Sequence, residues 1–200
     1  MSAYELVVVG ASWGGFGALG RLLADLPRDF GAAVAVAQHR GPDSAEAGLA
    51  EVLGRKSTLP VREAHDKDAI LPGRVYLAPP DYHLLVEREG TFALSTDAPE
   101  QHSRPSIDVL FESAAEAYGS RVVGVVLTGA SPDGAAGLAR IRRGGGFGLV
   151  QDPATADRSA MPEAAIARAG ADEVVALPQI APLLARLCGP GVAATRGEHR

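Results

Sequence analysis

The chain has 200 residues, a formal net charge of -5 and 46% hydrophobic residues, which fits one domain with a sizeable core. The basic residues form no long cluster and no apolar run reaches the length of a membrane span, so neither nucleic-acid binding nor membrane insertion is expected. Cys188 is the only cysteine, which excludes an intramolecular disulfide and a thiolate metal cluster; we expect a cytoplasmic protein without a signal peptide, metal or cofactor.

Short apolar, β-branched runs alternate with amphipathic stretches along the chain. In chain order, strands are predicted at residues 5–9, 33–37, 74–78, 122–127, 147–150 and 173–176, and helices at 15–24, 45–55, 107–118, 135–142, 161–169 and 180–187. Residues 83–86 and 92–95 flank a Glu89-Gly90 turn and predict a hairpin. The alternation indicates an α/β fold with a mostly parallel sheet covered on both faces. Residues 1–188 are predicted to form one domain, and 189–200 a flexible tail.

Ser12 occupies the turn between the first predicted strand and the first predicted helix, in Gly10-Ala11-Ser12-Trp13-Gly14. The pattern Gly-x-Ser-x-Gly is typical of a nucleophile elbow, which places a serine at a helix N-terminus where backbone N–H groups can stabilise an oxyanion. A glycine-rich turn with a helix-capping serine and no chemistry fits the same residues. A dinucleotide site is disfavoured, because Ser12 replaces the second glycine of that fingerprint and no acidic residue ends the second predicted strand.

Two other strand ends carry the remaining groups of a serine hydrolase. The second predicted strand ends at Gln38-His39, and Asp133 follows the strand predicted at 122–127. Because the carboxyl ends of parallel strands share one edge, we expect Ser12, His39 and Asp133 to converge as nucleophile, base and orienting acid. Taken singly, the histidine could be an ordinary strand-end residue and the aspartate a turn residue that caps the next helix. The order Ser, His, Asp differs from the Ser, Asp, His order of α/β-hydrolases, so that fold is not expected.

Four other histidines are alternatives for the base. His65 and His83 lie in polar or hairpin surroundings, and His199 lies in the tail. His102 is the strongest alternative because it precedes the helix-opening segment Arg104-Pro105-Ser106. The sequence contains no HExxH-type or carboxylate cluster that would indicate a metal site.

Six motifs occur in order between residues 6 and 187. They are Val9-Gly10-Ala11-Ser12-Trp13-Gly14-Gly15; Gln38-His39; Leu71-Pro72-Gly73 with Tyr76-Leu77-Ala78-Pro79-Pro80-Asp81-Tyr82-His83; Arg104-Pro105-Ser106-Ile107-Asp108-Val109-Leu110-Phe111; Leu127-Thr128-Gly129 with Asp133-Gly134-Ala135-Ala136-Gly137; and Gln151-Asp152-Pro153-Ala154-Thr155-Ala156 with Met161-Pro162. In this combination the chain resembles the catalytic domain of the chemoreceptor protein-glutamate methylesterases, the CheB-type family.

The resemblance implies a doubly wound parallel sheet with an antiparallel hairpin over residues 1–188, and a triad of Ser12, His39 and Asp133. It implies hydrolysis of glutamate γ-methyl esters on chemoreceptors or similar signalling proteins, with release of methanol, in chemotaxis-type signalling. Deamidation of glutamines is the family's second activity. Trp13 follows the nucleophile at a helix start, so its backbone N–H is a candidate oxyanion donor; Gly14 and Ala130 are further candidates for the oxyanion site or substrate cleft.

The chain also departs from the family pattern. Trp13 replaces a small hydroxyl residue, Ala130-Ser131-Pro132 replaces Met-Gly and one further residue, and Ser103 replaces a histidine before Arg-Pro-Ser. The tryptophan must either line the cleft or pack into the core. The first predicted strand begins within four residues of the N-terminus, so we expect a free-standing domain without the family's receiver domain. A hydrolase of the same fold acting on another ester or amide, and a non-catalytic signalling module, are the alternative functions.

Overall fold

The computed structural model describes residues 4–39 and 48–189. The large sheet contains β1 (Leu6–Ala11), β2 (Ala33–Gln38), β3 (Val61–Glu63), β4 (Val75–Leu77), β7 (Val122–Val126), β8 (Phe147–Gln151) and β9 (Glu173–Val175). Its strand order is β3-β4-β2-β1-β7-β8-β9, and all neighbouring strands are parallel. Strands β5 (His83–Val86) and β6 (Phe92–Ser95) form a separate antiparallel hairpin. The predicted fold class and the predicted hairpin are therefore confirmed.

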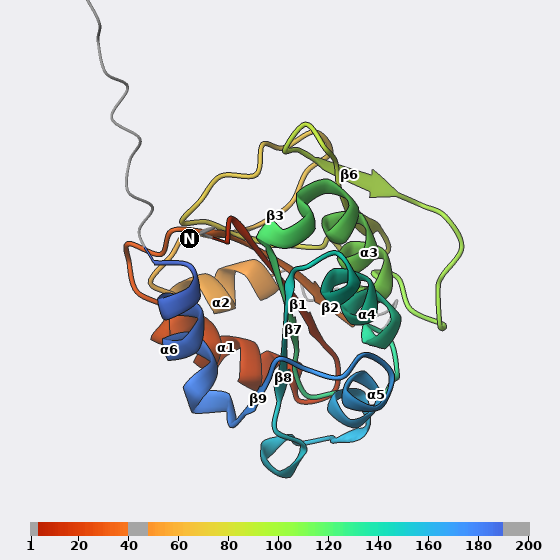
Figure 1. The fold of residues 1–200 in the computed structure, drawn as a ribbon. Helices are drawn as coiled ribbons and strands as arrows, with labels where there is room; N and C mark the ends of the chain where they lie inside the picture. The colour runs from red at the N-terminus through yellow and green to blue at the C-terminus, as the bar shows by residue number, and fades with distance from the viewer. Residues whose placement is uncertain (1–3, 40–47, 190–200) are drawn as a thin grey trace, which may run out of the picture.

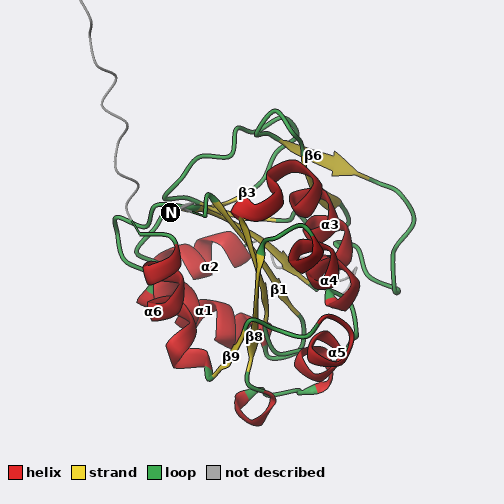
Figure 2. Ribbon diagram, viewed as in Figure 1, coloured by secondary structure: helices red, strands yellow, loops and turns green. Residues whose placement is uncertain are grey.

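The helices cover both faces of the large sheet (Figures 1 and 2). One face carries α1 (Gly15–Asp25), α2 (Leu49–Lys56) and α6 (Leu177–Leu187), and the other carries α3 (Ile107–Tyr118), α4 (Ala135–Arg143) and α5 (Ala160–Ala169). Short 3-10 turns lie at Gly119–Arg121 and Pro153–Thr155. No helix in the described ranges is long and apolar enough to cross a membrane.

Two apolar cores, one on each face of the sheet, fill the space between the sheet and the helices that cover it. In β1, Val7 and Val9 belong to the core under α1, α2 and α6, whereas Leu6 and Val8 belong to the core under α3, α4 and α5. All four side chains have no exposed surface. A central parallel strand is buried on both faces, which explains why its sequence is a continuous apolar run rather than an alternating one.

The order of the strands determines where a site can form. The chain runs from β1 to β2 and β4 on one side, and returns to β7 on the other side of β1. Ligands bind at such a switch point, beyond the carboxyl ends of the strands that diverge there. Ser12 follows β1, His39 follows β2, and the loop that contains Asp133 follows β7.

The differences from the predicted elements are small. Helix α2 begins at Leu49 rather than residue 45, and residues 45–47 of that prediction lie outside the described residues, as do residues 190–200 of the predicted tail. Helix α6 begins at Leu177, three residues earlier than predicted, with Pro178 in its first turn, where proline is tolerated. Strand β3 was not predicted, because only one of its three residues, Val61, is apolar; it exists through its pairing with β4.

Candidate active site

The turn that carries Ser12 is held by its backbone. The Ser12 N–H donates to the carbonyl of Thr128 at 3.0 Å, and the Ser12 carbonyl accepts from the Gly15 N–H at 2.8 Å. Gly14 has φ 79°, and a Cβ there would lie 2.4 Å from Asp157 Oδ2. A glycine is therefore required for the chain to turn sharply from β1 into α1, as the elbow pattern predicts.

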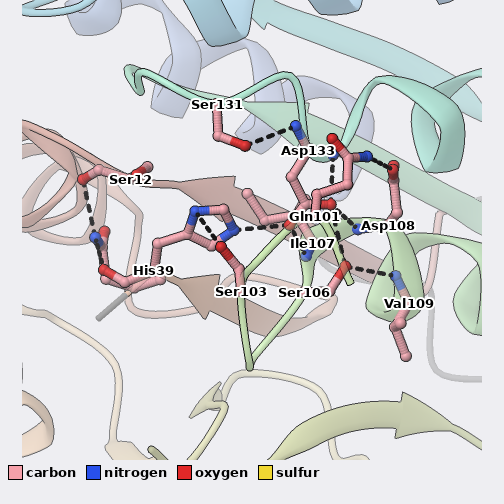
Figure 3. A network of polar contacts seen from close by, with 12 residues as sticks. Ser12, His39, Gln101, Ser103, Ser106, Ile107, Asp108, Val109, Ser131 and Asp133 are labelled. Carbon is pink, nitrogen blue, oxygen red and sulfur yellow. Dashed lines mark hydrogen bonds and ion pairs between the residues drawn. The ribbon is translucent and has the colours of Figure 1, made fainter. Parts of the chain in front are cut away.

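His39 is held in register with Ser12 by adjacent parallel strands. The His39 N–H donates to the Ala11 carbonyl at 2.9 Å, which extends the ladder between β1 and β2 by one step. The Gln38 amide nitrogen donates to the carbonyls of Ser12 and His39, both at 2.9 Å. In Figure 3 the His39 ring lies between Ser12 and Asp133.

The Asp133 carboxylate is fully buried and contacts His39, with 2.7 Å between Oδ2 and Nε2. The same Oδ2 accepts from the Ile107 N–H at 2.7 Å, and Oδ1 accepts from the Asp108 N–H at 2.9 Å and the Ser106 hydroxyl at 3.1 Å (Figure 3). These donors form the N-terminus of α3, where unpaired N–H groups and the helix dipole favour a negative charge. Asp133 therefore caps α3; before the helix that follows it in sequence it accepts, among the described residues, only from the Gly134 N–H, at 3.0 Å.

The charge of Asp133 determines the tautomer of His39. Burial acts to raise the pKa of Asp133, but the hydrogen bonds from His39 and from the Ile107 and Asp108 N–H groups outweigh it and hold this pKa below its ordinary value. An ionised carboxylate only accepts hydrogen bonds, so the Nε2 that contacts it carries the hydrogen. In the neutral ring, Nδ1 is then the nitrogen with the free lone pair.

Ser103 contacts this second ring nitrogen. Its Oγ lies 3.3 Å from His39 Nδ1 (Figure 3). Among the residues that the structure describes, no hydrogen bond joins the Ser12 hydroxyl to His39. The structure thus brings Ser12, His39 and Asp133 to one edge, and adds a second hydroxyl at the imidazole.

Asp108 forms the counterpart of the Asp133 cap. It lies in the first turn of α3, and its Oδ1 accepts from the Gly137 N–H of α4 at 2.7 Å, while Oδ2 accepts from the Gln101 amide at 2.9 Å. Burial raises the pKa of Asp108 to about 6; the Gly137 N–H opposes this shift and the charge of Asp133 adds to it. Asp133, which lies just before α4, thus caps α3, and Asp108 of α3 accepts a hydrogen bond from the first turn of α4.

Trp13 is exposed, with 65% of its surface accessible, so the alternative that it packs into the core is wrong. The Arg158 guanidinium lies 5.5 Å from the centre of its ring, at cation–π distance. The Trp13 carbonyl accepts from the Thr128 hydroxyl at 2.9 Å, and the same oxygen of Thr128 accepts from the Arg158 N–H at 2.9 Å. These bonds fix the backbone at Trp13 and Arg158, whose side chains are both exposed.

Trp13, Gly14 and Ala130 follow the ends of β1 and β7. Within residues 4–39 and 48–189, none of their backbone N–H groups donates a hydrogen bond to another residue. Free N–H groups beside a serine hydroxyl suit the binding of a negatively charged oxygen.

Within the described residues, no other histidine makes a hydrogen bond to Ser12, His39 or Asp133. His83 is buried; its Nε2 donates to the Ala98 carbonyl and its Nδ1 accepts from the Ser106 N–H, both at 3.1 Å, so both ring nitrogens make structural hydrogen bonds. His65 and His102 are exposed. His199 is outside the described part of the chain.

Sequence reasoning did not identify Ser106, Asp108 or Gln101 as parts of this network. Ser106 carried a usable signal, since a serine directly before a predicted helix is a preferred N-cap. Asp108 and Gln101 carried none, because the contact of Asp108 with Gly137 depends on the approach of α3 to α4, and that of Gln101 with Asp108 depends on the path of the loop before α3.

The family model described as CheB methylesterase matches residues 7–184. A relative from Leptospira interrogans, provisionally named protein-glutamate methylesterase/protein-glutamine glutaminase, is 44% identical over 92% of this chain and 95% of its own length. One from Symbiobacterium thermophilum with the same name, given without reservation, is 40% identical over 94% of this chain but 51% of its own length. The crystal structure of the Thermotoga maritima CheB methylesterase catalytic domain superposes with a TM-score of 0.87 at 34% identity, covering 92% of this chain and 98% of that one. This chain belongs to the CheB methylesterase family.

Proposed function

We propose that this chain hydrolyses γ-methyl esters of glutamate side chains in chemoreceptors or similar signalling proteins in the cytoplasm, and that it also deamidates glutamines. Ser12 is the nucleophile, His39 the base and Asp133 its partner. The names of the relatives supply the reaction and the class of substrate. The observation that carries the assignment of residues is the 2.7 Å contact between His39 and the buried Asp133, one strand away from Ser12.

The mechanism follows from the tautomer. His39 Nδ1 takes the proton of the Ser12 hydroxyl as Oγ attacks the ester carbonyl carbon, while Asp133 stabilises the imidazolium through Nε2. The backbone N–H groups of Trp13 and Ala130 stabilise the oxyanion of the tetrahedral intermediate. The C–O bond to the methoxy group then breaks, and methanol leaves with the proton from His39. Water, activated by the same nitrogen, hydrolyses the acyl-enzyme and regenerates Ser12.

The test is release of methanol from methyl-labelled chemoreceptor membranes. Ser12→Ala should abolish the release, whereas Ser120→Ala, which removes an exposed hydroxyl from the turn after α3, should leave it unchanged. Both variants should unfold at the wild-type temperature, since neither hydroxyl supports the core. Near-normal turnover by Ser12→Ala would contradict the assignment.

A second candidate is a serine hydrolase of the same fold with another ester or amide substrate. The exposed ring of Trp13 favours it, because the side chain next to the nucleophile contacts the substrate first. Hydrolysis of small esters that depends on Ser12, without release of methanol from receptor membranes, would support this candidate against the first.

A further inference from the structure

In this site the hydroxyl groups of two serines, Ser12 and Ser103, are candidates to donate a hydrogen bond to the same nitrogen, Nδ1 of His39. Nε2 of His39 is committed to Asp133 at 2.7 Å, so Nδ1 is the acceptor that remains, and Ser103 Oγ occupies it at 3.3 Å. Because Nδ1 carries a lone pair in this tautomer, the Ser103 hydroxyl donates to it. Each ring nitrogen has one in-plane direction for a strong hydrogen bond, so Ser12 and Ser103 compete for the same position.

The backbone around Ser103 fixes its place independently of Ser12. The Ser103 N–H donates to the Glu100 carbonyl at 2.8 Å, and the Glu100 N–H donates back to the Ser103 carbonyl at 3.2 Å, which closes a tight turn. The next residue, Arg104, bonds Asp81 Oδ1 at 2.6 Å and the carbonyls of Thr96 and Asp97 at 2.8 and 2.9 Å. The hydroxyl is therefore held beside the ring by a segment that is anchored on both sides.

We propose that Ser103 is a positioning residue: it holds Nδ1 of His39 until the chemical step and yields this nitrogen to Ser12 only as Ser12 attacks the bound ester. The proposal rests on the proposed function of Ser12 and His39. During attack, Nδ1 accepts the proton of Ser12 and returns it to the methoxy oxygen, so its hydrogen-bond direction belongs to these groups and not to Ser103. The bond to Ser103 is thus present before the reaction and absent during it.

An interaction that is stronger in the ground state than in the transition state slows the chemical step. A neutral hydrogen bond contributes an amount that corresponds to a factor of about two to ten in rate. Removal of the Ser103 hydroxyl should therefore raise kcat by about twofold to tenfold with KM unchanged.

The sharpest test needs no receptor. A fluorophosphonate forms a bond between its phosphorus and the attacking Oγ and releases fluoride. The rate at which it inactivates the enzyme therefore reports how strongly the Ser12 hydroxyl is activated, without a receptor substrate. Ser103→Val should react faster than Ser103→Thr by about twofold to tenfold, because the two side chains have the same shape and only threonine retains the hydroxyl. Ser103→Thr should react at the wild-type rate, and Ser103→Ala should resemble Ser103→Val. Melting temperatures of the Thr and Val variants verify that both remain folded.

The outcomes separate this proposal from the proposed function. Label on Ser12 with equal rates for the Thr and Val variants, or a slower Val variant, overturns the role of Ser103 and leaves Ser12 as nucleophile. Label on Ser103 instead of Ser12, identified by mass spectrometry, overturns the proposed triad itself.

Discussion

The two ends of the site have opposite characters. At one end, the Asp133 carboxylate is fully buried and both of its oxygens accept hydrogen bonds, from His39, Ser106 and the first turn of α3. At the other end, Ser12 is partly exposed and the Trp13 ring projects into solvent beside Arg158. An orienting charge must be desolvated and fixed, whereas a nucleophile must be reached by the substrate. Substitutions at the buried end should therefore affect stability and turnover together, and those at the open end should affect turnover or substrate choice with little effect on stability.

The largest expected effect comes from breaking the His39–Asp133 pair. His39→Ala and Asp133→Asn should each lower kcat by about 10⁴-fold, and the double variant should lose little more, because the triad works as a unit. Methanol release measures all three. His102→Ala is the control and should release methanol at nearly the wild-type rate. If His102→Ala abolished the release while His39→Ala lowered it only slightly, another residue than His39 would be the base.

Asp133→Asn should also destabilise the protein, by about 2–4 kcal/mol at pH 7, because the carboxylate caps α3. The folded pKa of Asp133 lies below its ordinary value of 3.8, so its contribution is present above that value and is lost as the pH falls through the folded pKa. Urea unfolding should therefore show a gap between variant and wild type that narrows in acid. Ser12→Ala provides the reference at the open end, and equal stability of the two variants would contradict the capping role.

For Asp108→Asn, the stability difference from wild type should change with pH in the opposite direction. The folded pKa of Asp108 is raised to about 6 from an ordinary 3.8, so the folded state binds this proton more tightly and wild-type stability falls as the pH rises through that window. Asparagine retains an acceptor for the Gly137 N–H without the charge. Relative to wild type, the variant should gain up to about 3 kcal/mol between pH 4 and pH 8. A gap that does not change with pH, measured by urea unfolding, would show that Asp108 ionises without penalty.

The smallest effect on stability is expected at Trp13. Because its ring is exposed, Trp13→Thr should change the free energy of unfolding by less than about 1 kcal/mol. It should change the ratio of kcat/KM for two methyl esters of different bulk, since the ring flanks the nucleophile. Phe16→Thr is the matched control: this ring is also exposed and has Lys56 5.3 Å from its centre. Strong destabilisation of Trp13→Thr with an unchanged ester ratio would remove its role in specificity.

Most of the fold follows from local pattern. Continuous apolar runs identified the buried strands, helical spacing identified the covering helices, and Glu89-Gly90 identified the hairpin turn. The convergence of Ser12, His39 and Asp133 followed from the rule that parallel strands end at one edge. The inferences about the strands, helices and hairpin succeed because burial and turn chemistry are properties of short segments.

The tertiary structure alone decided how the groups are bonded. Residues 106–108 donate to Asp133 because α3 packs against the start of α4, and Ser103 reaches His39 across 64 positions of the chain. Trp13 likewise contacts Thr128 and Arg158, which follow it by more than 100 positions in the chain. Contacts between distant segments depend on the paths of the loops and on the packing of helices, and no local pattern of apolar and polar residues encodes either.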